Sequence, residues 1–217
     1  MSEIMDYPFM SVIIPSFNQG DYIEETILSV LGQKYPKLEI IVIDGGSTDQ
    51  TVDILKNYSD QIFYWHSKTD KGQADAINQG MKVSSGDVLC WLNSDDMYLP
   101  GTLLDIGRRF SGRTKQSHFI HGSTITIKQS DVNSGAVVES AATANGSFDI
   151  FDLTSYDYIT QPSSFWTRKV WQVTGELDIK YKYVLDWEWF IRASRVAKFE
   201  YVPRFYSIYR CHSLNKT

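Results

Sequence analysis

The sequence predicts an α/β fold in which helices flank a mainly parallel sheet. Over the first hundred residues, short runs of β-branched and aromatic residues alternate with helical patterns of apolar residues, as in βαβ units. Turns rich in glycine, proline and aspartate separate these runs. The 217 residues, of which 42% are hydrophobic and 22% charged, suffice for a sizeable core.

The first half of the chain contains four predicted strands, at residues 10–14, 39–43, 62–65 and 88–92. Capping-box spacing predicts that two helices begin near Asp21 and Ser47. A third helix is expected over 72–83. A fourth is expected over 100–110, where Pro100 suits the first turn of a helix.

The second half has a less regular pattern. We expect a strand over 118–128, followed by a long loop over 129–146 that is rich in serine, alanine, asparagine and glycine. Further elements are a short helix over 167–173, a longer one over 183–196 and a strand over 201–210.

Three polar segments follow predicted strands of the first half. They are Pro15-Ser16-Phe17-Asn18, Asp44-Gly45-Gly46-Ser47 and Asn93-Ser94-Asp95-Asp96. In open α/β sheets, ligands bind beyond the carboxyl ends of the strands, so these segments predict one binding edge.

The adjacent carboxylates of Asp95 and Asp96 repel each other. Either Mg²⁺ or Mn²⁺, which favour oxygen ligands, or a cationic partner would offset this repulsion, and exposure to water in a turn is the third possibility. Phe17 could stack on a base and Asp44 could accept a hydrogen bond from its ring. The alternatives are a core position for Phe17 and helix capping by Asp44. Neither a GxGxxG nor a Walker motif is present, which argues against dehydrogenases and P-loop enzymes.

Charge and composition limit the partners. The net charge of −5 provides no overall attraction for nucleic acid. Residues 168–217 hold 10 basic against 5 acidic residues, so this part could bind phosphate or rest on an anionic membrane, or it could be a solvated surface. Two cysteines and the lack of a signal peptide or an apolar span predict a cytoplasmic protein, with any membrane contact peripheral, at the inner face.

Four segments of the sequence, in the same order, resemble family 2 glycosyltransferases with the GT-A fold. They lie at 11–51, 70–103, 161–178 and 185–192 and include IDGGSTD, LNSDD, QPSSFW and LDWEWFIR. The resemblance implies one GT-A domain over 1–217, with a nucleotide-sugar-binding half at 8–112 and an acceptor-binding half at 113–217. It also implies a nucleotide-sugar donor, preferably a UDP-sugar, an Mn²⁺ or Mg²⁺ cofactor, and inversion at the anomeric carbon.

The resemblance further implies a hydroxyl acceptor on a glycan or a lipid-linked molecule, in cell-surface polysaccharide biosynthesis. Two alternatives remain. A catalytically silent carbohydrate- or nucleotide-binding protein could use the same scaffold, and a sugar-phosphate nucleotidyltransferase would require a basic glycine-rich loop after the first strand. SFNQGDY lacks that loop.

The resemblance assigns roles by position. Asp96 is expected to bind the metal directly and His212 to close over the metal or the diphosphate. Asn93 stands where many family members have an acidic residue, and with Gln161 and Trp187 it is expected near the sugar or acceptor. The expected nucleotide contacts are Pro15, Ser16, Phe17, Asn18, Asp44, Lys71, Asp75 and Asp95.

The resemblance places the catalytic base at the start of the helix near residue 185, where Asp186 matches and Glu188 is the competitor. Residues two apart on a helix point to nearly opposite sides, so both cannot face the acceptor. Glu188 lies four residues before Arg192, a favourable ion-pair spacing. We therefore expect Asp186 to be the base, and Glu188 remains the alternative contact on the acceptor side.

Overall fold

A computed structural model describes residues 6–129, 135–142, 149–213 and 215. Its strands are β1 (Met10–Ser16), β2 (Leu38–Asp44), β3 (Tyr64–Ser67), β4 (Val88–Trp91), β5 (Met97–Tyr98), β6 (His118–Lys128), β7 (Val137–Ala142), β8 (Ser164–Thr167) and β9 (Lys198–Cys211). Within these residues the strands form one sheet in the order β3-β2-β1-β4-β8-β6-β9-β5, and β7 pairs with β6.

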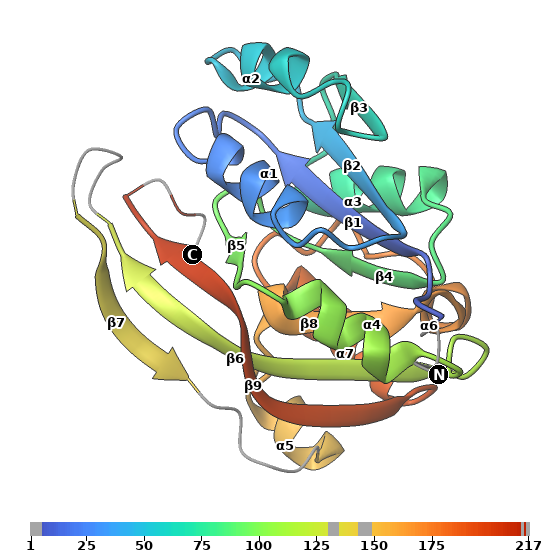
Figure 1. Ribbon diagram of the computed structural model, residues 1–217. Helices are drawn as coiled ribbons and strands as arrows, with labels where there is room; N and C mark the ends of the chain where they lie inside the picture. The colour runs from blue at the N-terminus through green and yellow to red at the C-terminus, as the bar shows by residue number, and fades with distance from the viewer. Residues whose placement is uncertain (1–5, 130–134, 143–148, 214, 216–217) are drawn as a thin grey trace.

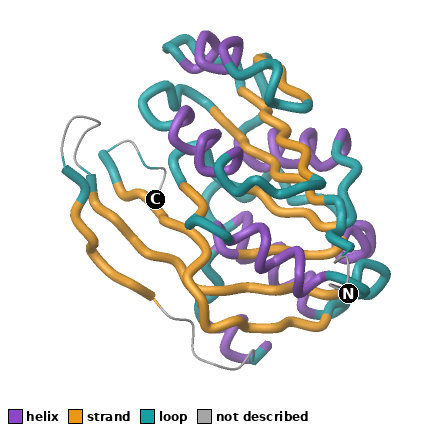
Figure 2. Tube along the Cα trace, viewed as in Figure 1, coloured by secondary structure: helices purple, strands orange, loops and turns teal. Residues whose placement is uncertain are grey.

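Helices cover both faces of this sheet (Figure 1). They are α1 (Ile23–Leu31), α2 (Thr51–Asn57), α3 (Gln73–Val83), α4 (Thr102–Phe110), α5 (Ile150–Ser155), α6 (Arg168–Thr174), α7 (Leu185–Ser194) and the short 3-10 helix η1 (Gln161–Ser163). The path through strands, helices and loops is traced in Figure 2. The predicted α/β class is confirmed.

The sheet is parallel where the chain alternates strands and helices. β1 pairs in parallel with both β2 and β4, and β3 pairs in parallel with β2. β8 then joins antiparallel between β4 and β6, while the long β9 runs parallel to β6. Because β1, β2 and β4 all end at one edge, their following loops converge there, as the sequence predicts.

Alternating side chains of β1 build the two cores. Val12 and Ile14 pack on the side covered by α1 and α4, whereas Ile13 packs on the side covered by α3 and α7. The second core is dense in aromatic rings, with Trp166 and Trp189 4.8 Å apart between ring centroids. No helix formed by the described residues has the length and apolar character that crossing a bilayer would require.

Several predicted boundaries are wrong. Neither predicted capping box forms: α1 begins at Ile23 and α2 at Thr51, and neither has a side-chain cap. Asp49 instead accepts a hydrogen bond from the backbone of Gly20 at 2.8 Å, so this side chain joins two loops. The third strand begins two residues later than predicted, at Tyr64.

The predicted loop over 129–146 contains a strand. β7 pairs antiparallel with β6 through a register shift, so main-chain hydrogen bonds order a segment whose composition suggested a loop. Residues 130–134 and 143–146 of that prediction lie outside the described residues.

His121 on β6 is fully buried beside Tyr158 and Tyr201, and neither ring nitrogen has a hydrogen-bond partner among the described residues. Burial lowers the pKa of His121 from 6.5 to about 4. The unfolded chain therefore takes up a proton between these two pH values, while the folded chain does not.

We expect the free energy of unfolding to decrease by roughly 3 kcal/mol from this group as the pH falls from 6.5 to 4. Urea denaturation at several pH values measures this dependence, and His121→Phe should reduce it. The same replacement at half-buried His66 is the control. Identical slopes for wild type and His121→Phe would contradict the burial argument.

Candidate active site

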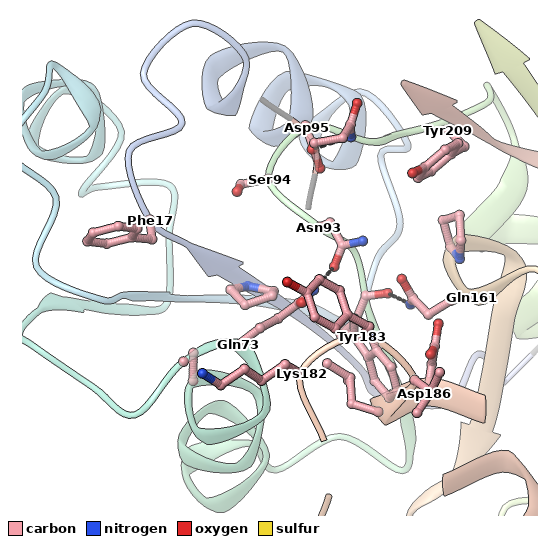
Figure 3. A pocket seen from close by; sticks show the side chains of 18 of the residues that line it. Phe17, Gln73, Asn93, Ser94, Asp95, Gln161, Lys182, Tyr183, Asp186 and Tyr209 are labelled. Atoms are coloured by element: carbon pink, nitrogen blue, oxygen red, sulfur yellow. Dashed lines mark hydrogen bonds between the residues drawn. The ribbon is translucent and has the colours of Figure 1, made fainter. Parts of the chain in front are cut away.

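A pocket of about 1170 Å³ opens at the edge of the sheet where β1 and β4 end. Side chains from both halves of the chain line it (Figure 3). Phe17 lies at one end and Asp186 at the other, with Gln73 and Asn93 between them. Of the residues expected from sequence, the pocket is lined by Pro15, Ser16, Phe17, Asn93, Asp95, Gln161, Asp186 and Trp187.

The loop after β1 presents an aromatic face to the pocket. Pro15 and Ser16 are buried in the wall, whereas the Phe17 side chain is 59% exposed. The core alternative for Phe17 is therefore wrong. Asn18 does not line the pocket, because its side chain accepts a hydrogen bond from Thr48 N at 2.9 Å and its backbone adopts a positive φ of 51°.

Asp44 also points away from the pocket. It is fully buried, and one carboxylate oxygen accepts hydrogen bonds from Gly46 N at 3.2 Å, Ser47 N at 2.9 Å and the Ser67 hydroxyl. The Ser47 hydroxyl donates to the other oxygen. These bonds hold the glycine turn after β2, so the structure does not bring Asp44 to the expected nucleotide contact.

Lys71 and Asp75 likewise lie outside the pocket. The Asp75 carboxylate accepts hydrogen bonds from Lys71 N and Gln79 Nε2, both at 3.1 Å, and so ties the first turn of α3 together. The chain enters α3 through Gly72 at φ 105°, a conformation that favours glycine. This turn directs Gln73 into the pocket.

Asp95 and Asp96 face opposite environments. Asp95 lines the pocket, whereas Asp96 is fully buried and accepts hydrogen bonds from Arg210 N at 3.1 Å and Asn93 Nδ2 at 3.2 Å. Burial and the negative charge of Asp95 raise the pKa of Asp96 well above its ordinary value, although both hydrogen bonds act in the other direction. The prediction that Asp96 is the direct metal ligand therefore does not fit this geometry.

Asp95 has two partners from the C-terminal segment. Its Oδ2 lies 3.1 Å from His212 Nε2 and 3.2 Å from Asn215 Nδ2. His212 does not line the pocket, and its ring packs on Tyr22 with centroids 4.3 Å apart. Among the described residues there is no group of three or more potential metal-ligating side chains. The His212 side chain is fully buried, so it does not reach the pocket as expected, and Asp95 is the side chain through which the pocket could hold a cation that completes its shell with substrate oxygens.

Asn93 connects the pocket to buried Asp96. Its amide oxygen accepts a hydrogen bond from Gln73 Nε2 at 2.8 Å, which Figure 3 shows, and its amide nitrogen donates to Asp96. A carboxylate at position 93 could not donate this second bond. The neutral side chain is therefore compatible with a neighbouring carboxylate that is already buried.

The two acidic residues of α7 are separated as the helix geometry predicts. Asp186 lines the pocket, whereas Glu188 does not and accepts two hydrogen bonds from Arg192, at 2.6 and 2.9 Å. The geometry therefore does not bring Glu188 to the pocket that Asp186 lines. Trp187 lines the pocket beside Asp186, and its indole donates to Leu153 O at 2.6 Å.

Gln161 combines a structural bond with a place in the pocket, since its Nε2 donates to Trp91 O at 2.8 Å. The sequence interpretation missed several polar side chains of the pocket. Spacing alone could have indicated Gln73, at the start of a helix after a strand, but the others have no local motif. The polar side chains of the pocket that the sequence interpretation missed include Asp70, Gln73, Asp157, Lys182, Tyr183 and Tyr209.

Part of the sequence matches a known protein family, and the chain is similar to several named proteins. Residues 11–117 match the family described as glycosyl transferase family 2. A PGL/p-HBAD biosynthesis glycosyltransferase of Mycobacterium bovis is 28% identical over 192 residues, which cover 87% of this chain and 70% of that protein. An uncharacterised glycosyltransferase of Rickettsia typhi is 41% identical over 96 residues, and the match covers 44% of this chain and 30% of that protein.

Solved structures share the fold. S. aureus TarS 1-349 in complex with UDP-GlcNAc aligns over 95% of this chain and 60% of its own, with a TM-score of 0.72 and 20% identity. The mannosyltransferase PcManGT from Pyrobaculum calidifontis, in complex with GDP-Man and Mn²⁺, aligns over 94% of this chain and 57% of its own, with a TM-score of 0.67 and 16% identity. The likeness shows a GT-A fold.

Glu188→Gln should lower the free energy of unfolding by about 1 kcal/mol or less, because the Arg192 pair is partly exposed. Urea denaturation measures this loss. Glu176→Gln, which removes the more exposed pair with Lys82, is the matched control and should have a smaller effect. An equal effect of the two replacements would contradict the structural role of Glu188.

Proposed function

This chain belongs to glycosyltransferase family 2, and on that premise we propose that it transfers a sugar from a nucleotide-sugar donor to an acceptor hydroxyl. The observation that carries the proposal is that one pocket joins an exposed aromatic ring, Phe17, to the carboxylates of Asp95 and Asp186. Those groups suit a nucleotide base, a metal-bound diphosphate and a reacting hydroxyl respectively. The first-half residues 8–112 form the proposed donor part and residues 113–217 the acceptor part.

The donor is a UDP-sugar in this proposal. Phe17 provides the stacking face for the base, with Pro15 and Ser16 beside it in the wall. Support for UDP comes from TarS, whose fold is similar and which binds UDP-GlcNAc in its crystal structure. The loops that hold Asn18, Asp44 and Asp75 by internal hydrogen bonds keep this wall in place.

The proposed cofactor is Mn²⁺ or Mg²⁺, held by Asp95, whose carboxylate His212 orients from outside the pocket. Support comes from the Asp95 carboxylate on the pocket, an oxygen ligand of the kind these cations favour, and from PcManGT, whose structure is a complex with GDP-Man and Mn²⁺. When bound, the cation would offset the negative charge that develops on the departing diphosphate. In this proposal Asp96 does not bind the cation. Its hydrogen bonds with Asn93 and Arg210 N hold the loop that carries Asp95.

Asp186 is the proposed catalytic base. Its carboxylate removes the proton of the acceptor hydroxyl as the oxygen attacks the anomeric carbon from the face opposite the diphosphate, which gives inversion. The half-buried side chain at the start of α7 is fixed next to Trp187, which offers an apolar face to the acceptor. Gln161 lies on the same side of the pocket and can hydrogen-bond the sugar or the acceptor.

The proposed acceptor is a glycan or a lipid-linked molecule in cell-surface polysaccharide biosynthesis. A cytoplasmic site at the inner face of the membrane suits it, with peripheral contact through the basic C-terminal part. The loop before α7 supports this contact, because exposed Ile179 and Tyr181 alternate with Lys180 and Lys182.

Donor binding and turnover test the proposal. A panel of UDP- and GDP-sugars with Mn²⁺ or Mg²⁺ should yield at least one ligand by calorimetry, and one donor should be hydrolysed or transferred. Asp186→Asn should lower turnover at least 100-fold and leave the donor Kd within threefold, because only the proton acceptor is lost. Glu188→Gln is the matched control on the same helix. No binding of any nucleoside diphosphate with metal would refute the proposal.

A second test distinguishes the roles of Asp95 and Asp96 in metal-dependent nucleotide binding. Asp95→Asn should weaken Mn²⁺-dependent UDP binding at least tenfold, because a neutral amide is a poorer ligand for a hard cation. Asp96→Asn should weaken that binding less than Asp95→Asn does, since its buried side chain acts only through the loop that carries Asp95. Calorimetry with and without Mn²⁺ measures both variants, and the reverse order of effects would return the ligand role to Asp96.

A further inference from the structure

A second carboxylate, that of Asp157, lies near the proposed base Asp186. Asp157 lines the same pocket as Asp186, in the segment between α5 and η1. The hydrogen bond from the Trp187 indole to Leu153 O, at 2.6 Å, fixes α5 against the start of α7. That contact holds the segment containing Asp157 next to Asp186.

The local bonding of Asp157 leaves part of its carboxylate available. Oδ1 accepts a hydrogen bond from Ile159 N at 3.2 Å, a turn contact two residues along the chain. Within the described part of the chain, no hydrogen bond is found to Oδ2. A purely structural role would require only an acceptor at Oδ1, and an asparagine side chain could provide that equally well.

Electrostatics link the two carboxylates. Asp157 is exposed as a residue but lines the pocket, whose walls, together with the negative charge of Asp186, raise the pKa of Asp157 to about 7, against the hydrogen bond from Ile159 N, which acts to lower it. Lys182 is a further charged side chain on this pocket, and Tyr158 is the neighbouring titratable group. Near neutral pH, Asp157 can therefore either donate or accept a hydrogen bond.

The groups around this pair suit a sugar residue. Carboxylates bind neighbouring hydroxyls of a polyol through hydrogen bonds, while an aromatic face packs against its C–H groups. Trp187 and Tyr158 supply such faces beside Asp186 and Asp157. When one of the two carboxylates is protonated, the pair can hydrogen-bond two hydroxyl groups. The ionised carboxylate accepts a strong hydrogen bond, and the protonated one can donate.

We propose that Asp157 and Asp186 together bind two neighbouring hydroxyls of the acceptor, so that the acceptor is a sugar with a vicinal diol. Asp186 takes the proton of the attacking hydroxyl, whose oxygen forms the new bond to the anomeric carbon. The bond from that carbon to the diphosphate breaks, and its electron pair leaves with the phosphate oxygen. Asp157 is a positioning residue that holds the second hydroxyl. The inference rests on the proposed glycosyl transfer.

The coupling of the two carboxylates can be measured without an acceptor. In protein labelled with ¹³C at the aspartate carboxyl groups, NMR titration should reveal a resonance that titrates near pH 7 in the wild type. It should be absent in Asp157→Asn and should titrate at least one pH unit lower in Asp186→Asn. A resonance of Asp157 that is unaffected by Asp186→Asn would overturn the pairing, even if glycosyl transfer is established.

The acceptor class is tested with methyl glycosides of glucose, galactose, mannose and rhamnose, each with vicinal hydroxyls, and the donor selected by the panel. Asp157→Asn should raise the KM for the best glycoside at least tenfold, should account for most of the loss in kcat/KM, and should leave the UDP Kd unchanged. Asp152→Asn, exposed on α5 and outside the pocket, is the matched control and should behave as wild type.

The outcomes are separable. An unchanged glycoside KM in Asp157→Asn would assign Asp157 to the turn alone and overturn the inference. A wild-type enzyme that hydrolyses its donor but uses none of the glycosides would overturn the diol assignment. Absence of any nucleotide binding would instead refute the proposed function, and the NMR titration would still decide whether the two carboxylates are coupled.

Discussion

The buried guanidinium of Arg210 joins three parts of the molecule that the site requires. Its side chain is only 3% exposed and donates to Glu25 on α1, to Gln129 at the end of β6 and to Asp95 O after β4. Its backbone nitrogen donates to Asp96. A charge this deeply buried is stable only when hydrogen bonds satisfy it, so these partners are held together. The direction in which Asp95 faces depends on this arrangement.

The fold was largely predictable because strand and helix periodicities reflect burial. Val12, Ile13 and Ile14 alternate between two cores, and the run of apolar residues before Asn93 is a fully buried strand. The strand β7, within the segment 129–146 that was expected to be a loop, was not predictable, because it is ordered by main-chain pairing with β6 rather than by its own side chains. Such pairing leaves little mark on composition.

The site was predictable where backbone direction alone decides the outcome. Phe17, Asp95 and Asp186 follow strand ends or begin a helix, and the topology brings them to one edge. The direction of a side chain after such an end was not predictable. Asp44 has the chemistry of a ligand contact, yet nearby backbone nitrogens and hydroxyls turn it inward. Asp157 belongs to no local pattern, and contacts between α5 and α7 help to bring it near Asp186.

The contact between Arg210 and Asp96 spans 114 positions of sequence. During synthesis, the strands β1 to β4 leave the ribosome before β9. Until β9 is made, Asp96 lacks the hydrogen bond from Arg210 N. An ionised carboxylate is well solvated in water, whereas its transfer to a closed core has an unfavourable free energy unless it is paired or hydrogen-bonded. The contacts of Arg210 that order the edge carrying Asp95 therefore cannot form before β9 has been synthesised. During synthesis, this edge can thus be completed only after the strands β1 to β4 have emerged.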